Sequence, residues 1–138
     1  MTFDNTERAS LAALADELIP AGEGLPCASE ADVSGSGLDR VLAVRPELGE
    51  ALKQVLDIVK GRPAKESVAE LKADHLGAFM ALTECVAGAY FLNPQVRAGL
   101  GYHGQIPHPI DPKPDFRDDD LLQSVMDRGR IYRPTPPE

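Results

Sequence analysis

The proline-rich end of the chain, residues 101–138, is the feature that most restricts the fold. It holds seven of the twelve prolines, two of the three histidines and two of the three tyrosines. Each proline fixes its own φ angle, removes a backbone donor and pushes the preceding residue toward extended backbone. Most of this segment is therefore predicted to run extended, along a polyproline-like path. It also keeps apolar side chains that a solvated tail has little reason to carry, which favours an arm docked on a protein surface: Tyr102, Ile106, Ile110, Phe116, Ile131 and Tyr132.

Length and charge restrict the remaining possibilities. A chain of 138 residues with 43% hydrophobic content suits one domain with a core of its own. The net charge of −8, without any cluster of Lys or Arg, argues against nucleic-acid binding. No apolar run is long enough to span a membrane.

The start of the chain and its cysteines bear on the compartment. The first residues show neither a signal peptide nor a twin-arginine motif, so we expect a cytoplasmic protein, periplasmic only if a partner carrying the signal exports it. Cys27 and Cys85 form no CxxC pair and are expected to be reduced thiols.

The first hundred residues predict successive helices. Leu11, Leu14 and Leu18 follow the helical period after a capping cluster at Asp4, which predicts a helix over residues 6–19. Residues 21–36 are rich in Gly, Ser and Pro and are predicted to be loop, with Ser29 able to cap a turn of helix. Further helices are predicted by apolar spacing and by Pro or Gly at the ends: a short one around 38–42, then about 46–60, 63–74, 75–92, 95–100 and, inside the arm, 118–128.

The predicted helix at 75–92 is apolar nearly all round, which favours a central position. No segment shows the alternation of a strand. We therefore predict an all-α fold: a small irregular helical bundle with a long extended Pro-rich C-terminal arm. Residues 1–100 form the helical domain, and residues 101–138 form the arm, with one short helix, as part of the same structural unit.

Residues with catalytic or metal-binding chemistry are few and poorly spaced. His103, His108 and Asp111 are types that bind zinc or iron, but the intervening prolines would splay their side chains. Cys85 lies among apolar residues, where the pKa of a thiol rises and its reactivity falls. The sequence therefore predicts no catalytic, cofactor-binding or metal-binding residues, and a small metal or thiol enzyme is the least favoured interpretation.

Several segments, in order, resemble one known family. They are LAALADELIP at 11–20, ASEADV at 28–33, LDRVL at 38–42, VAGAYFLNP at 86–94, VR at 96–97, LGY at 100–102 and GQ at 104–105. This series is similar to the gluconate 2-dehydrogenase subunit 3 family, the small gamma subunits of flavin-dependent dehydrogenases, and covers nearly the whole chain.

The resemblance implies a partner. It implies that this chain is a non-catalytic helical subunit that stabilises a large FAD-containing subunit of the glucose-methanol-choline (GMC) type. That subunit would oxidise an alcohol group of a sugar, sugar acid or related polyol, and a cytochrome c subunit is a further expected partner. It implies FAD in the partner and no cofactor in this chain.

The arm supplies the predicted partner interface, because aromatic anchors and satisfied polar groups dominate such surfaces. The candidate residues are Tyr102, His103, Gln105, His108, Phe116 and Tyr132. Packing of the arm on its own helices remains the alternative at each position, equally weighted at Tyr102. At the level of function, the alternative is an independent helical interaction module, for example a homodimer whose arms exchange between protomers.

Overall fold

The computed structural model describes residues 2–105 and 119–131 of the chain. The contacts within it divide the chain into two units, Met1–Gly104 and Gln105–Glu138. The described residues are helices and connecting turns, with only an isolated bridge between Gly22 and Leu25 in place of a strand. The predicted all-α class is therefore confirmed.

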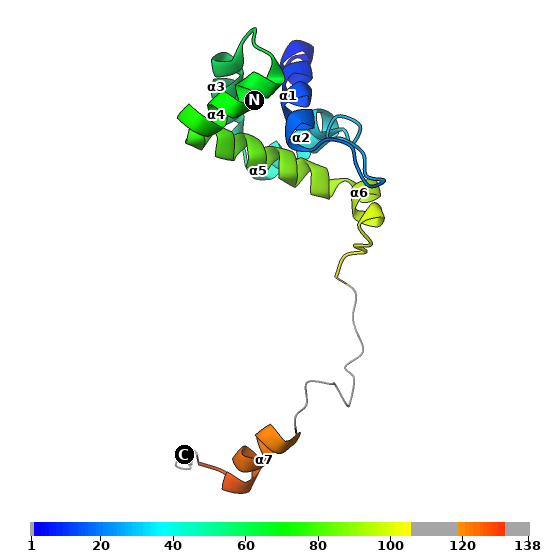
Figure 1. Ribbon diagram of the computed structural model, residues 1–138, viewed down its shortest axis with the longest axis vertical. Helices are drawn as coiled ribbons and strands as arrows, with labels where there is room; N and C mark the ends of the chain where they lie inside the picture. The colour runs from blue at the N-terminus through cyan, green and yellow to red at the C-terminus, as the bar shows by residue number, and fades with distance from the viewer. Residues whose placement is uncertain (1, 106–118, 132–138) are drawn as a thin grey trace, which may run out of the picture. The chain divides into compact units, whose positions relative to one another are not determined.

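The α-helices match the predicted segments closely, whereas η1 (Val33–Gly37) lies mostly in the segment predicted to be loop. In chain order they are α1 Asn5–Leu18, η1 Val33–Gly37, α2 Leu38–Val44, α3 Glu47–Val59, α4 Ala64–Asp74, α5 Leu76–Leu92, α6 Pro94–Gly99 and α7 Asp119–Arg128 (Figure 1). Pro63, Pro94 and Gly61 lie at the ends of helices as predicted, because proline suits a first turn and Gly61 has a positive φ angle. None of the helices in the described part is long and apolar enough to cross a membrane.

The start of α1 is fixed by side chains. Asp4 accepts a hydrogen bond from the Glu7 backbone, and the Glu7 carboxylate accepts one from the Asp4 backbone, so the two residues form a capping box. Lys53 of α3 also donates to Glu7 at 2.5 Å and lies 4.6 Å from the centre of the Phe3 ring. The bond from Lys53 and that from the Asp4 backbone lower the pKa of Glu7. These contacts join the first turn of α1 to α3.

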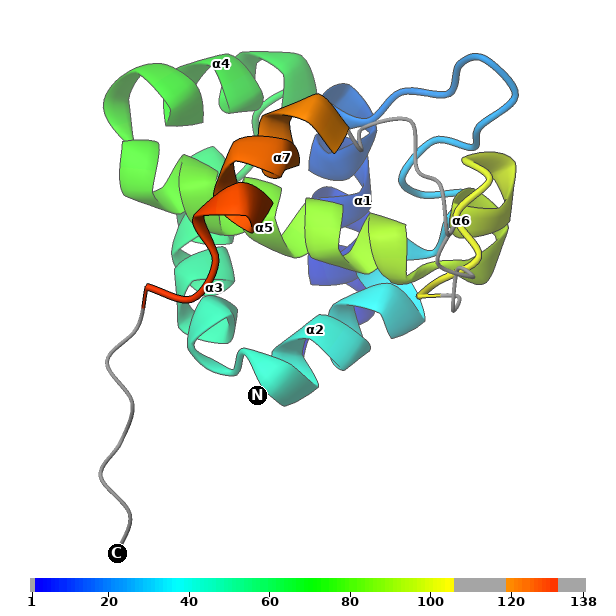
Figure 2. The same ribbon diagram turned by 90° about the horizontal axis from the view of Figure 1, so that it is seen from below.

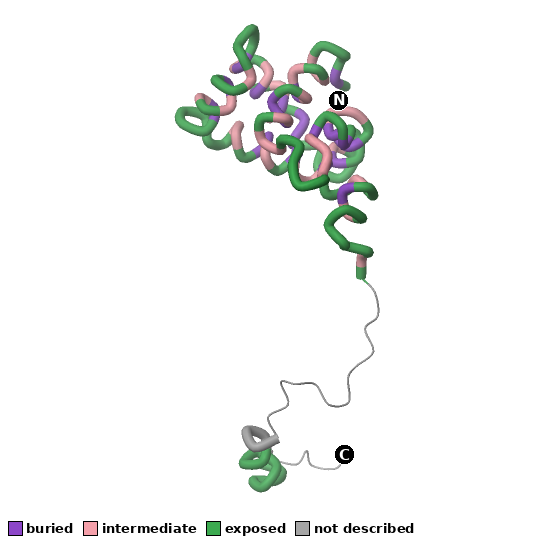
Figure 3. The backbone as a smooth tube through the Cα atoms, turned by 45° about the vertical axis from the view of Figure 1, so that its right-hand side comes forward, coloured by how far each residue is buried: buried purple, intermediate pink, exposed green. Residues whose placement is uncertain are grey.

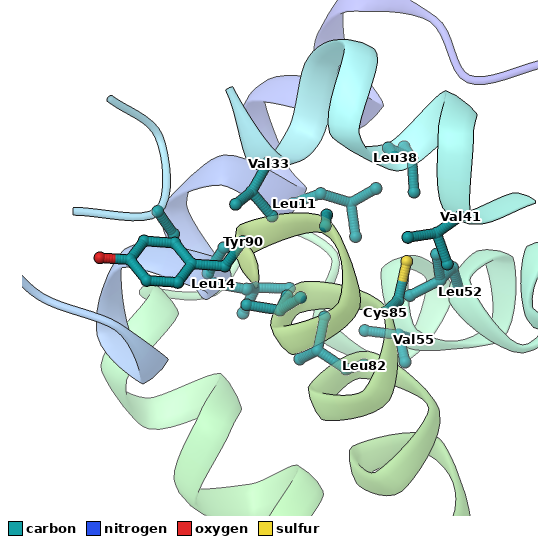
Figure 4. Close-up of a cluster of buried hydrophobic side chains, with 14 of the residues drawn as sticks. Leu11, Leu14, Val33, Leu38, Val41, Leu52, Val55, Leu82, Cys85 and Tyr90 are labelled. Carbon is teal, nitrogen blue, oxygen red and sulfur yellow. The ribbon is translucent and has the colours of Figure 1, made fainter. Parts of the chain in front are cut away.

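Helix α5 lies at the centre of the first unit. It contacts α2, α3, α4, α6 and η1. Figure 2 shows it running across the other helices. Its inner face joins side chains of α1, α2 and α3 in one buried cluster, drawn in Figure 4. The central position predicted from its composition is confirmed, and Figure 3 shows the buried residues gathered in the middle of this unit.

The loop before α2 is held by side chains from the helices around it. Tyr90 donates to the Pro26 carbonyl at 2.7 Å, and Asn93 donates to the Ala31 carbonyl at 2.9 Å. Arg8 donates to the carbonyls of Ser34 and Gly35. A Gly- and Ser-rich segment therefore has a defined path because α1, α5 and Asn93 satisfy its backbone.

The predicted Ser29 cap was wrong. The Ser29 backbone N–H donates to Asp16 at 2.7 Å, and residues around it form turns that lead to no helix at this point. Asp32 is the capping residue instead: it adopts a left-handed conformation, with a φ angle of 56°, and its carboxylate accepts from the Ser36 backbone. Asp side chains tolerate this conformation because they bond nearby backbone.

Helix α7 belongs to the second unit. Its last two turns expose Val125 and Met126, and Ile131 beyond it is also exposed. Gln123 donates to Asp127 one turn later, at 2.7 Å. The predicted helix inside the arm is therefore present, with an apolar side that its own unit leaves uncovered.

Candidate interaction surface

The end of α6 determines how the arm leaves the helical unit. The Gly101 N–H donates to the Ala98 carbonyl, and the Tyr102 N–H donates to the Arg97 carbonyl at 2.8 Å. Gly101 has a φ angle of 70°. This pattern is a Schellman motif, which ends helices with a left-handed glycine. It fixes the backbone of Tyr102 relative to α6.

Tyr102 is 54% exposed as a whole residue, although its backbone is anchored. His103 and Gln105, the next predicted interface residues, are exposed as well. The structure therefore places Tyr102 and His103 on one exposed segment at the end of the first unit, and Gln105 is the first residue of the second unit. The other predicted interface residues, His108, Phe116 and Tyr132, lie outside the described residues, as does Asp111 of the metal hypothesis.

A second exposed apolar surface lies on α5 and was missed from the sequence. Leu76, Met80 and Phe91 are 60%, 61% and 54% exposed. Thr83 and Ala87, partly exposed, lie between them on the same side of the helix. We call these five residues the α5 face. The signal was present in the sequence, because a helix of this length with a single charged residue leaves some of its apolar circumference uncovered in a small bundle.

The one charge of α5 is paired. Arg45, which follows α2, donates to Glu84 at 2.5 Å and also to Glu47. The bonds to Glu47 and then Glu84 raise the pKa of Arg45, so it stays protonated. The charge of Glu84 beside the α5 face is thereby balanced within the same chain.

The cavities do not coincide with these surfaces. One cavity is an open cleft of about 580 Å³ between the start of α1 and the end of α3, with Glu7, Asp57, Lys60 and Arg62 among its lining residues. A small apolar pocket in the core includes Cys85. Neither contains a predicted interface residue.

The two thiols lie in different surroundings. Burial, with a smaller contribution from the Glu84 charge, raises the pKa of Cys85 to about 11, so little thiolate exists near neutral pH. Cys27 is half-buried, and its sulfur lies 3.3 Å from the Ser29 hydroxyl. Within residues 2–105 and 119–131, no three His, Cys, Asp or Glu side chains gather as metal ligands would.

The comparisons with known proteins gave no match to a protein-family model, a curated protein or a solved structure.

Proposed function

We propose that this chain is a non-catalytic small subunit that binds and stabilises a larger catalytic subunit through the base of its C-terminal arm. The observation that carries the proposal is the Schellman motif at the end of α6, which anchors the backbone of Tyr102 while the residue remains 54% exposed. Tyrosine is a frequent interface anchor because it supplies a large contact area together with a hydroxyl that can bond.

The fixed backbone matters for affinity. Association costs free energy whenever side chains and loops become ordered, so a segment already held in place loses less on binding. The exposed His103 follows directly and offers a polar side chain next to Tyr102 in the sequence. This combination of an aromatic anchor with polar neighbours is typical of a protein–protein interface.

The proposed partner is the FAD-containing GMC-type subunit named by the sequence resemblance, with a cytochrome c subunit as a further component. In such a complex the flavin supplies the redox chemistry, and this chain supplies binding. The reaction would be oxidation of an alcohol group on a sugar, sugar acid or related polyol.

The test is a pulldown of the tagged full-length chain from its native cells. We expect a large protein to co-elute and the eluate to show the visible absorption of an oxidised flavin. Tyr102→Ala should lose most of the co-eluting chain. Phe91→Ala is the matched control, because Phe91 is equally exposed but lies on α5. A colourless protein that elutes alone would overturn the proposal.

An independent interaction module is the second candidate, favoured by the exposed Val125 and Met126 of α7. A short helix is marginal in water unless its apolar side packs against something. An arm-exchanged homodimer would satisfy this requirement. Size measurement of the purified chain, with Met126→Asp as the disrupting variant, tests this candidate without any partner.

A further inference from the structure

Arg97 of α6 carries a charge that the described part of its own chain does not pair. Its Nε atom is buried and has no hydrogen-bond acceptor among the described residues, and no carboxylate there pairs with its guanidinium. Residues 93–105 contain no Asp or Glu, although the whole chain carries 22 of them. A buried donor without an acceptor is rare in folded proteins and costs free energy, so this one calls for an explanation.

The other arginines of the first unit do find acceptors within it. Each of the four donates to a carboxylate or to a backbone carbonyl: Arg8 to Asp39, Arg40 to the Leu92 carbonyl, Arg45 to Glu84 and Arg62 to Glu70. Arg97 differs from them in its location, because it lies in the short helix that leads to the arm. Its acceptor is therefore sought outside the first unit.

Arg97 lies beside Tyr102, at the surface proposed for docking. The Tyr102 N–H donates to the Arg97 carbonyl at 2.8 Å, so the Schellman motif holds these two residues next to each other. Leu100, between them in the chain, is 49% exposed. A partner that covers Tyr102 therefore also removes water from the half-buried Arg97. Removing water from an unpaired charge is costly, and an opposite charge on the partner offsets that cost.

We infer that the larger subunit places an Asp or Glu side chain against the guanidinium of Arg97, next to the Tyr102 contact. The inference rests on the proposed function, because it names the chemistry of the partner surface that meets the base of the arm. Arginine suits this role because its planar fork binds both oxygens of a carboxylate. In a chain with a net charge of −8, such a local cation determines which face an acidic partner surface approaches.

The first measurement uses the full chain alone. Arg97→Met keeps an apolar stem and removes the donor that lacks an acceptor, so the urea midpoint should stay the same or rise. Arg8→Met is the matched control, because it removes bonds to the Ser34 and Gly35 carbonyls and the pair with Asp39, and its midpoint should fall. A midpoint that falls as far in Arg97→Met would place the acceptor within the chain and overturn the inference.

The second measurement is the flavoprotein pulldown. Arg97→Met should weaken binding at least tenfold, as expected when one side of a buried charge pair is removed, so most of the flavin absorption should disappear from the eluate. Arg97→Lys keeps the charge without the fork and should retain more of the partner than Arg97→Met. Lys72→Met is the matched control: Lys72 is exposed on α4, at the opposite end of α5 from α6 (Figures 1 and 2). It should capture as much flavoprotein as the wild type.

The outcomes separate the two proposals. If the wild type captures the flavoprotein and Arg97→Met captures as much, the carboxylate contact is excluded while the proposed function stands. If Arg97→Met and Lys72→Met lose the flavoprotein equally, total charge rather than this position is responsible, and the inference fails in the same way. A wild-type chain that elutes alone overturns both proposals.

Discussion

Gly35 has no room for a Cβ atom, because the Asp32 side chain lies too close. A Cβ atom there would lie 1.9 Å from Oδ1 of Asp32, the carboxylate that accepts from the Ser36 N–H and hydroxyl. Gly35→Ala must displace that carboxylate, so we expect the free energy of unfolding to fall by about 1–3 kcal/mol. Urea denaturation of the wild type and the variant measures this change in unfolding free energy.

Gly77 supplies the control for this substitution. It lies in α5, and nothing lies within 4 Å of a Cβ atom built on it. Gly77→Ala is expected to stabilise the protein by up to about 1 kcal/mol, because alanine loses less backbone entropy in a helix. Equal effects of the two substitutions would contradict the Asp32 conflict.

Asp32 also gives the turn a pH dependence. The Ser36 hydroxyl and backbone N–H, with a smaller contribution from Arg8, hold the pKa of Asp32 below its ordinary value of 3.8. A carboxyl whose pKa is lower in the folded state stabilises the protein above its unfolded pKa. That contribution is lost as pH falls through the folded value.

We therefore expect Asp32→Asn to destabilise the protein more near pH 6 than at a pH below the lowered pKa of the native carboxyl, where protonation weakens the bonds to Ser36. Urea denaturation of both proteins at the two pH values measures the difference in unfolding free energy. Other carboxyls, such as Glu7, affect both proteins alike, so the comparison isolates Asp32. A difference that stays constant across this range would exclude the assignment.

Among the elements, α6 depends most on a single residue. The Asn93 side chain accepts from the backbone of Gln95 at 2.8 Å and donates to the Ala31 carbonyl at 2.9 Å. It therefore caps α6 and holds the loop before η1. We expect Asn93→Ala to cost about 1–2 kcal/mol of unfolding free energy in urea denaturation.

Gln95→Ala is the control for the cap, because Gln95 is exposed and its substitution should change stability by less than about 0.5 kcal/mol. Since α6 also positions the backbone of Tyr102, Asn93→Ala should in addition reduce the amount of partner that co-elutes in the pulldown. A cost no larger than that of Gln95→Ala would show that the cap is not needed.

For the molecule as a whole, Cys85 reports on opening of the core. Its sulfur lies among buried side chains of α2 and α3 (Figure 4), and burial raises its pKa to about 11. We expect the half-buried Cys27 to react with a thiol reagent in native protein, and Cys85 to react only as urea unfolds the chain. Cys27→Ser should leave the native chain unreactive, and rapid labelling of that variant would show that the core opens locally.

The positions of the α-helices could be predicted from the sequence without the tertiary structure. Their bounds follow from interactions between residues close in the chain: Asp4 with Glu7, Asn93 before Pro94, and glycine after the last turn at Gly61 and Gly101. Such local contacts can be identified from spacing alone.

The tertiary structure alone decided which sides of these helices are covered. Helix α5 is apolar nearly all round, so its sequence could not show that α2, α3 and α4 bury one side and leave Leu76, Met80 and Phe91 exposed. Likewise, the spacing of the loop residues did not show that Asp16 of α1 accepts from the Ser29 N–H or that Asp32 is the capping residue before η1. Burial and long-range hydrogen bonds are relations between elements, and periodicity within one segment does not contain them.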